Sequence, residues 1–337
     1  MNKKLLLWIL GIFILTVVTL ISGLGEIVSI LFDLDASLLI LFLISLGTLQ
    51  LITLCLVAFQ WYYLFGKSSE EISFSRVFLI NQTGGFVESV TPSSKMGGEA
   101  AKLYLYNNIT SIDYEKLTSL LLGHKYISLA PFLLIGFFTL VFLASFLYAM
   151  PLVVYLSFGS LGVLTLILFL LIYFEGKSSG WSKKLDVGFP MIEKFYTKFI
   201  LAVQFVQRAS NTTKKILTPK TRNSLFVVSF VVWAIYPFKI YVTAQVLGIQ
   251  LNFLLAIIVT YSTYLVSMLP ITPGGLGTFE GSMAVILRLN GFLFAEGMAI
   301  ALLARVITFW FPLLISAGST IYLIKKEDIE VFGYEIV

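Results

Sequence analysis

The sequence predicts an all-α membrane protein, a polytopic bundle of transmembrane helices with seven or eight spans and two internal repeats, each with a broken or re-entrant segment. The first observation behind this prediction is composition, because 58% of the 337 residues are hydrophobic and only 12% are charged. Soluble globular domains carry about 25% charged residues. The second observation is the length of the apolar runs, and the third is a repeated pattern of helix-breaking residues.

Apolar runs long enough to span a bilayer occur along the whole chain, since a helix needs about 20 apolar residues to cross roughly 30 Å of hydrocarbon. The first run follows Lys3-Lys4 and is interpreted as a retained span, because it is longer than a signal-peptide core and no small-residue cleavage site follows. Trp61-Tyr62-Tyr63 is expected to anchor the end of the second span at the interface. The runs cover residues 5–22, 37–60, 117–147, 151–173, 223–247, 251–269 and 295–324.

The central segment is the longest polar stretch and separates two membrane halves. Residues 175–222 hold ten Lys and Arg against three acidic residues, whereas 23–36 hold three acidic residues and no basic one. Excess Lys and Arg marks cytoplasmic loops, so the N-terminus and the central segment are predicted to be cytoplasmic in a multi-pass plasma-membrane protein. The predicted organisation is half one at 1–174, a basic loop at 175–222, half two at 223–324 and a tail at 325–337.

Within the basic loop, apolar residues recur at helical spacing between Ile192 and Val206. This pattern predicts an amphipathic helix on anionic inner-leaflet lipids, with a solvated connector helix as the alternative. Basic residues dispersed in this way indicate membrane topology, and we expect no nucleic-acid partner.

An internal repeat appears when the sequence is moved by 181 residues, from 91 to 272. Transporters are commonly built from such repeats, with sites where broken helices of the two halves meet. Four predicted spans separate the two breaks, so the repeats are expected to share one orientation in the membrane. The shift aligns Thr91-Pro92 with Thr272-Pro273, Glu99 with Glu280, His124 with Arg305, and Pro131 with Pro312.

Each repeat contains a predicted broken segment, at about 81–106 and 270–290. Proline removes a backbone donor and glycine frees the backbone, so helices end or unwind there. Such segments persist in membranes only where protein buries them or water reaches them, and a helix that restarts there offers its N–H groups to anions. The break residues are Pro92, Gly97, Gly98, Pro270, Pro273, Gly274, Gly275 and Gly277.

Ionisable residues inside apolar runs are costly and therefore indicate functional sites. Arg305 lies deep in the last run, and Glu280 is its expected partner, with Glu99 and Lys125 or His124 as the equivalent set; a purely structural ion pair is the alternative. Lys239 is expected to extend its side chain to a nearby span end. The candidate substrate-binding residues are Arg305, Glu280, Lys125, His124, Glu99, Lys102 and Lys95.

Catalytic and metal-binding patterns are absent from the sequence. His124 is the only histidine and Cys55 the only cysteine, so neither a His-based nor a Cys-based metal site is predicted. No nucleophile and base stand in a recognisable motif. We therefore expect no catalytic residue, metal or cofactor, and a transporter is a better interpretation than an enzyme.

Two stretches resemble a known family. The pattern P-x-T-P-G-G-L-G-x-F-E (270–280), followed by A-R-x-x-x-x-W-x-P (304–312), resembles the membrane domain of the lysylphosphatidylglycerol synthetase/flippase family. The stretch T-P-x-x-x-x-G-G-E-x-x-K-L-Y-L (91–105) is similar to the first-half motif of that domain. This resemblance implies a flippase-like domain, whose relatives move lipids with charged headgroups between leaflets.

The sequence also departs from that family in two ways. Gly123-His124 stands where the family usually has Glu-Arg, although Lys125 follows directly. The soluble aminoacyl-transferase domain is not found after the last predicted span, so lipid aminoacylation is not expected.

The favoured function is that of a lipid flippase or transporter whose partner is a membrane phospholipid or glycolipid headgroup. The alternatives are an intramembrane lipid-modifying transferase and a non-catalytic partner subunit tethered through 175–222. Product formation from labelled lipid would distinguish the transferase, because a flippase leaves lipid chemistry unchanged.

Overall fold

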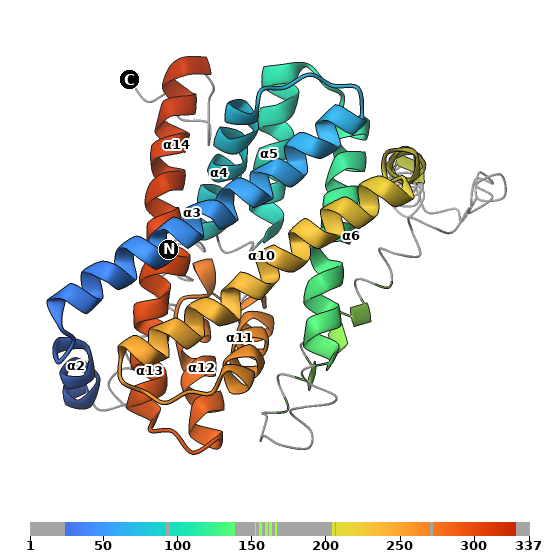
Figure 1. The fold of residues 1–337 in the computed structure, drawn as a ribbon. Coiled ribbons are helices and arrows are strands. Elements are labelled where there is room, and N and C mark those ends of the chain that lie inside the picture. Colours follow the sequence, from blue (N-terminus) through green and yellow to red (C-terminus); the bar gives the residue numbers. More distant parts are fainter. Residues whose placement is uncertain are drawn as a thin grey trace, which may run out of the picture.

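A computed structural model describes residues 24–91, 95–138, 204–269 except 206, and 272–327, with a few single positions between 152 and 166. The regular elements in these ranges are all helical (Figure 1), which confirms the predicted all-α membrane class. The apolar run 5–22, most of the run 151–173, most of the basic loop with its predicted amphipathic helix, and the tail beyond 327 lie outside the described residues.

Four helical units of the described chain are long and apolar enough to cross a membrane. The last of them runs from Phe294 to Glu327 and contains a π-helical turn, Val306–Trp310, between its two α-helical parts. Asp35 begins the first unit by accepting the backbone N–H groups of Ser37 and Leu38, which caps its free N-terminal donors. The units are α3 (Ala36–Lys67), α6 (Tyr114–Phe138), α10 (Pro219–Val246) and α13 (Phe294–Arg305) continued by α14 (Phe311–Glu327).

A proline inside α10 is accommodated by a neighbouring helix. Pro237 cannot donate to the carbonyl of Trp233 four residues earlier. The Tyr261 hydroxyl donates to that carbonyl at 3.0 Å, so the freed acceptor is paired inside the bundle.

Two helical hairpins lie between the long helices. Hairpin one consists of α4 (Phe74–Val90) and α5 (Lys95–Thr110), and hairpin two of α11 (Phe253–Ser267) and α12 (Thr278–Leu289). The α11 helix has 15 residues, about 22 Å at 1.5 Å per residue, which is too short to cross roughly 30 Å of hydrocarbon. The run 251–269, predicted as a span, therefore forms one arm of a hairpin.

The hairpins sit at opposite ends of the long helices (Figure 1). Hairpin one packs on the C-terminal half of α3 and the N-terminal half of α6, in a core that contains Trp61, Leu105 and Leu117. Hairpin two packs on the C-terminal half of α10, in a core that contains Ile240 and Phe279. The expected shared orientation of the repeats is thus wrong. The α11 helix, at 15 residues, is too short to count as one of the four spans predicted between the breaks.

The same order of elements occurs twice in the described chain. A long helix, a hairpin and a second long helix form α3 to α6, and the same series forms α10 to α14. The helix α6 begins at Tyr114 and α13 begins at Phe294. The separation of these two residues in sequence is close to the 181-residue shift of the repeat. This order supports the duplication, which stays a prediction.

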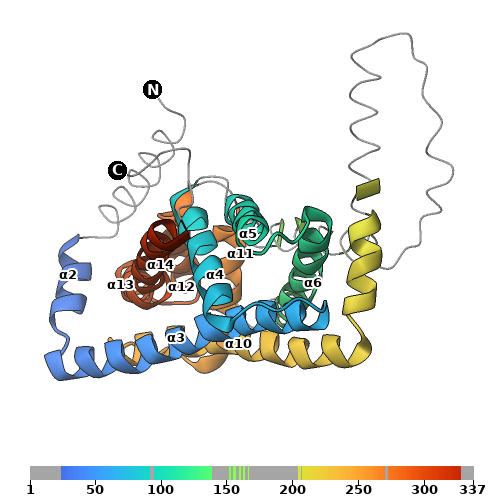
Figure 2. The same ribbon diagram turned by 90° about the horizontal axis from the view of Figure 1, so that it is seen from above.

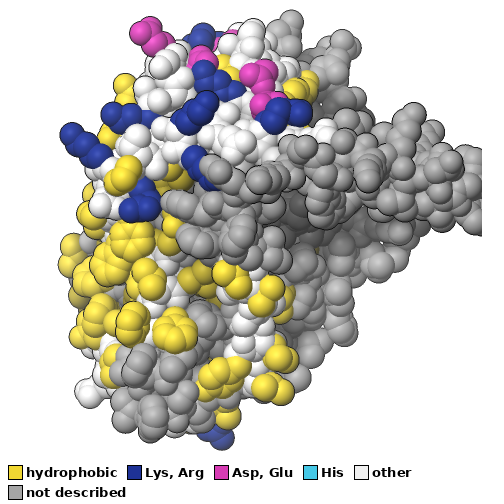
Figure 3. All heavy atoms as spheres, turned by 90° about the vertical axis from the view of Figure 1, so that its right-hand side faces the viewer, with side chains coloured by type: hydrophobic (Ala, Val, Ile, Leu, Met, Phe, Trp, Pro, Cys, Tyr) yellow, Lys and Arg dark blue, Asp and Glu magenta, His cyan; other side chains and the backbone are white. Residues whose placement is uncertain are grey.

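The helices α3 and α10 lie side by side along one face of the bundle (Figure 2). The Gln60 amide on α3 donates to the Ser229 hydroxyl on α10 at 2.7 Å, so this contact is partly polar. Figure 3 shows charged side chains gathered at one end of the molecule and apolar side chains over the region below. Exposed apolar residues on the long helices, as a membrane surface requires, include Leu41, Ile44, Leu134, Val227 and Leu314.

Candidate functional site

The turn of hairpin two is built by glycines in left-handed conformations. Gly274, Gly275 and Gly277 have φ values of 59°, 68° and 78°. Residues that carry a Cβ rarely adopt such positive values. A Cβ on Gly274 would lie 2.5 Å from the Phe309 ring and 3.4 Å from the Ser89 carbonyl oxygen. The second contact joins the tips of the two hairpins, because Ser89 lies at the end of α4. The helix is therefore interrupted at the position predicted from Pro273 and the glycines that follow it.

Glu280 and Arg305 form a buried ion pair beside this turn. The Arg305 Nε donates to Glu280 Oε1 at 2.7 Å, and Arg305 Nη2 donates to the Gly274 carbonyl at 2.8 Å. The other carboxylate oxygen, Oε2, accepts the Gly277 N–H at 2.7 Å. The guanidinium carbon lies 4.8 Å and 4.4 Å from the ring centroids of Phe279 and Phe309. Both charges are thus paired with each other and tied to the broken backbone.

Hairpin one brings its two arms together at glycines. A Cβ on Gly98 would lie 2.5 Å from the Gly84 carbonyl oxygen, and a Cβ on Gly84 would overlap Lys102 Cγ. Only glycine permits this distance between α4 and α5. The stem of Lys102 therefore lies across α4, and its ammonium is held next to Glu99.

Glu99 accepts from two lysines through one oxygen. Its Oε1 lies 3.0 Å from Lys102 Nζ on α5 and 2.5 Å from Lys125 Nζ on α6. Glu99 and Lys102 are buried, while the Lys125 side chain keeps 27% of its surface exposed. The predicted equivalent of the Glu280 pair is therefore made by Lys125.

His124 occupies the sequence position equivalent to Arg305 but faces another helix. Its Nε2 lies 3.1 Å from Gln60 Oε1 on α3. Because the Gln60 amide donates to Ser229, its carbonyl faces His124, which places the imidazole proton on Nε2 and leaves Nδ1 as an acceptor. The His124 ring lies 5.0 Å from the Trp61 ring.

Comparison of the sequence with known proteins assigns the chain to a family. Residues 8–316 match the lysylphosphatidylglycerol synthase TM region, a range that includes both hairpins and both sets of ion pairs. The chain belongs to this family.

Three relatives of this chain are UPF0104 membrane proteins. A UPF0104 membrane protein of Methanothermobacter thermautotrophicus is 21% identical over 316 residues, with 92% of each chain covered. One of Pyrococcus horikoshii is 22% identical over 324 residues, covering 93% of this chain and 95% of its own. One of Methanocaldococcus jannaschii is 26% identical over 347 residues, covering 98% of this chain and 96% of its own.

In this family member the two ion-pair sites differ in charge. The Glu280 site joins one guanidinium to one carboxylate, whereas the Glu99 site joins two ammonium groups to one carboxylate. The Glu280 site also uses both oxygens of its carboxylate, whereas the Glu99 site uses one. The first is neutral with both carboxylate oxygens paired, and the second has a surplus positive charge and a carboxylate oxygen, Oε2, without a partner within the described ranges.

Unpartnered polar atoms are concentrated in the first half of the chain, which contains the Glu99 site. Within the described ranges, five of six buried side-chain atoms without a hydrogen-bond partner belong to the first half, and the sixth is Thr263 Oγ1. Buried polar atoms in native proteins are nearly always paired, so such a group indicates a site for a ligand or water. The five are Trp61 Nε1, Asn81 Oδ1, Thr83 Oγ1, Glu99 Oε2 and His124 Nδ1.

Direct contacts join most of these groups. Trp61 stacks on Tyr106 with ring centroids 5.5 Å apart, and the Tyr106 hydroxyl accepts from Asn81 Nδ2 at 3.0 Å. The Lys102 ammonium lies 5.5 Å from the centroid of the Trp61 ring. We call this set the Glu99 cluster; it comprises Trp61, Asn81, Glu99, Lys102, His124 and Lys125.

The sequence-based interpretation missed the aromatic and amide members of this cluster. Trp61 was expected at the membrane interface, yet it is fully buried, because α4, α5 and α6 enclose the end of α3. Asn81 and Gln60 were not singled out. Amide side chains within apolar sequence were the available signal, since buried amides need partners.

Lys239 is also placed differently from its expectation. It is completely buried and donates to Gln50 Oε1 and, at 3.2 Å, to Thr53 Oγ1 on α3. Its ammonium lies 4.9 Å from the centroid of the Tyr236 ring. No carboxylate pairs with it in the described part of the chain. Its side chain therefore turns into the contact between α3 and α10 and does not reach a span end.

Several residues predicted for the site are not part of either ion-pair site in the described structure. Pro92 and Pro270 lie outside the described residues, as does the side chain of Lys95, the first residue of α5. Gly97 lies in the first turn of α5. No group of three or more His, Cys, Asp or Glu side chains suited to a metal occurs among the residues searched in the described ranges.

Proposed function

We propose that this protein is a lipid flippase or transporter that moves a lipid with a polar or charged headgroup between the leaflets of a membrane. The observation that carries the proposal is the Glu99 cluster, a buried site with surplus positive charge and unpartnered polar atoms inside a bundle of membrane-spanning helices. Ionisable residues within a bundle of membrane-spanning helices are costly and commonly mark the path of a substrate. The family resemblance points to the same function.

The two hairpins suit a transport role. They enter from opposite ends and meet at Ser89 and Gly274. In transporters, broken helices of two halves commonly meet near the middle of the bilayer, where substrate is exchanged between sides. Movement of one hairpin against the other would expose the Glu99 cluster to one leaflet at a time.

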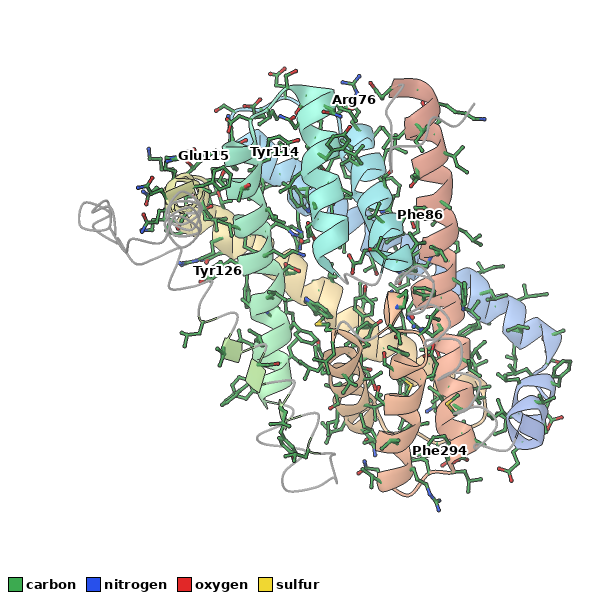
Figure 4. The ribbon with its side chains drawn as sticks, turned by 180° about the vertical axis from the view of Figure 1, so that it is seen from behind. Arg76, Phe86, Tyr114, Glu115, Tyr126 and Phe294 are labelled. Atoms are coloured by element: carbon green, nitrogen blue, oxygen red, sulfur yellow. The ribbon has the colours of Figure 1, made fainter. Side chains whose placement is uncertain are left out.

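We further infer which end of the bundle faces the cytoplasm. Arg76, Tyr114 and Glu115 lie at one end and Phe294 at the other (Figure 4). The first end, where α3 and α14 end and α6 begins, carries Lys67, Lys116, Lys325 and Lys326 together with Glu70, Glu71, Asp113 and Glu327. The second end, where α3 and α13 begin, carries Glu26, Asp33, Asp35 and Glu296 with one basic residue, Arg288, so Lys and Arg are more numerous at the first end. Excess basic residues mark the cytoplasmic side, so the end near Arg76 is assigned to it.

This assignment agrees with the charge pattern of the whole chain. If neither hairpin crosses and the runs 5–22 and 151–173 each cross once, the chain has six spans. The N-terminus, the basic loop 175–222 and the tail then share the cytoplasmic side. This count is one lower than the predicted seven because the run 251–269 is a hairpin arm and adds no span.

The proposal is tested by lipid scrambling in proteoliposomes, with fluorescent lipids whose outward movement is read by quenching. Lys125→Gln is expected to slow scrambling by tenfold or more, because it removes the partly exposed ammonium of the Glu99 cluster. Lys116→Gln is the matched control, since Lys116 lies on the same helix and pairs with Glu70. Equal rates in wild-type, Lys125→Gln and empty vesicles would refute the proposal. Recovered lipid of altered mass would favour a transferase.

A further inference from the structure

A short helix before α10 lies crosswise to the rest of the bundle. It covers residues 207–216, and it is seen end-on beside the start of α10 in Figure 1 and along its length in Figure 2. Thr218 caps α10 and Pro219 begins it. Because a proline disfavours helical backbone at the residue before it, one helix ends there and the chain turns into the next. We call residues 207–216 the crosswise helix.

One face of the crosswise helix is buried against α6. Thr213 is fully buried, and its hydroxyl donates to the Ser119 carbonyl on α6 at 2.8 Å. A Cβ on Gly123 would lie 3.5 Å from Thr213 Cγ2 and 3.6 Å from the Leu217 side chain, so the segment is in direct contact with α6 at that glycine. The contact lies two residues before Lys125 in sequence.

The opposite face is exposed and basic. Arg208 and Lys215 are exposed, and their spacing of seven residues places them on the same side of the helix. Lys220, which is also exposed, and Arg222 follow at the start of α10. Residues 204–222 contain five Lys and Arg and no acidic residue. The segment therefore concentrates positive charge at one surface of the molecule.

Carboxylates of the protein neutralise only part of this charge. Glu115 on α6 pairs with Arg208 at 2.8 Å, and that arginine side chain still keeps 56% of its surface exposed. Lys215, Lys220 and Arg222 are in no ion pair within the described ranges. These three cations are thus available to an anionic partner.

The position of the segment matches the headgroup layer of a membrane. The helix α10, which is long and apolar enough to span a membrane, begins at Pro219, so the crosswise helix lies at the end of a span. Figure 3, which views this side of the molecule, shows Lys and Arg side chains directly above exposed apolar ones. Anionic headgroups attract basic segments at this depth, and the attraction falls off within a Debye length.

We propose that the crosswise helix and the start of α10 form a docking surface for anionic phospholipids of the adjacent leaflet, which is the cytoplasmic leaflet in the orientation assigned to the bundle. The occupant is an anionic membrane surface, because the cations are spread along a face at headgroup depth and lack counter-ions from the described chain. The docking surface recognises the charge of the lipid and not the identity of its headgroup. It shares no residue with the Glu99 cluster and does not depend on the proposed transport.

Lipid bound at the docking surface would hold α6 in place. The hydrogen bond from Thr213 to Ser119 and the contact at Gly123 join the docking surface to α6. A ligand that binds only the folded protein stabilises it. Anionic lipid is therefore expected to raise the temperature at which the protein unfolds.

The test measures which lipids gather around the crosswise helix. In a chain with Cys55→Ala, Asn211→Cys places a fluorescent donor at an exposed position of this helix, and lipids labelled on an acyl chain are the acceptors in phosphatidylcholine vesicles. Energy transfer is expected to show about fivefold or greater enrichment of phosphatidylglycerol and of phosphatidylserine over phosphatidylcholine. High salt should abolish the enrichment, because it screens exposed charges. Enrichment of neither anionic lipid, of only one, or of both at high salt would overturn the proposal.

Two double variants locate the docking surface. Lys215→Gln with Lys220→Gln should reduce the enrichment at least threefold and lessen the rise in unfolding temperature caused by anionic lipid. Lys325→Gln with Lys326→Gln removes the same charge from the end of α14, away from the start of α10 (Figure 1), and should change neither quantity. Equal losses in both variants would assign the enrichment to net charge, and no loss in the first would place it at another surface. Either result would overturn the proposal, and neither depends on whether the vesicles scramble lipid.

Discussion

Lys125 on α6 donates to Glu99 on α5 at 2.5 Å, while the residue before it in sequence turns to a different helix. Successive residues on an α-helix point about 100° apart. His124 therefore faces Gln60 on α3 when Lys125 faces α5. Adjacent residues of α6 thus contact two different helices, α3 through His124 and α5 through Lys125. His124, the position equivalent to Arg305, forms no ion pair in the described chain.

The Glu280–Arg305 pair is expected to behave as a coupled unit. Glu280→Gln leaves a buried guanidinium without its anion and should lower the free energy of unfolding by about 3–5 kcal/mol. Replacing both residues, as Glu280→Leu with Arg305→Met, should cost clearly less than the sum of the two single changes. Denaturant unfolding of the detergent-solubilised protein measures the four states. Additive losses would show that the pair contributes little coupling.

Gly274 should tolerate alanine worse than another glycine with a similar backbone. Gly248 has φ of 72° and open space within 4 Å of the position that a Cβ would take, so Gly248→Ala should cost only the backbone strain, about 1–2 kcal/mol. Gly274→Ala adds an overlap with the Phe309 ring at 2.5 Å, which should add about 1–3 kcal/mol. The comparison is made by thermal unfolding. Equal losses would mean that the Phe309 ring moves aside freely.

Adjacent glycines in α4 are expected to respond in opposite directions. A Cβ on Gly84 would meet Lys102 and the Gly98 carbonyl within 3 Å, whereas one on Gly85 would meet nothing within 4 Å. Gly84→Ala should therefore destabilise the protein by about 1–3 kcal/mol. Gly85→Ala should stabilise it by up to about 1 kcal/mol, because alanine favours helix. Unfolding midpoints measure both, and the same sign for both would contradict close packing in hairpin one.

Lys239 and Gln50 should show strong coupling. Gln50→Leu removes an acceptor from a buried ammonium and should cost about 1.5–3 kcal/mol. Lys239→Met removes the charge itself, so the double variant should be at least as stable as Gln50→Leu alone. A double-mutant cycle in detergent measures the coupling. A coupling energy near zero would show that the ammonium finds another acceptor.

The two ends of the bundle should lie on opposite sides of the membrane. In a chain with Cys55→Ala, single cysteines at Glu26 and Lys67 mark these ends, and neither position is buried. An impermeant thiol reagent applied outside intact cells is expected to label Glu26→Cys and to reach Lys67→Cys only after permeabilisation. The reverse pattern would invert the proposed orientation. Labelling of both positions from one side would exclude it.

The broken turn of hairpin two could be predicted from sequence because its requirements are local. Pro273 lacks a backbone N–H and so ends the helix, and Gly274, Gly275 and Gly277 adopt the left-handed φ values that the turn needs. The pairing of Glu280 with Arg305 was also expected, since a buried charge in apolar sequence needs a partner and few are available. These inferences needed no knowledge of which helices touch.

The sequence by itself thus determined the class of protein, the position of the break in hairpin two and one ion pair, whereas Gly97 and Gly98, predicted as break residues, lie within helix α5. Only the tertiary structure decided that α11 is a hairpin arm, that the hairpins oppose each other, and that Trp61 and Lys239 are buried. It also selected Lys125 over His124 as the partner of Glu99. The reason is that hydropathy and backbone preference act within a few residues, whereas burial and pairing depend on helices that meet from distant parts of the chain.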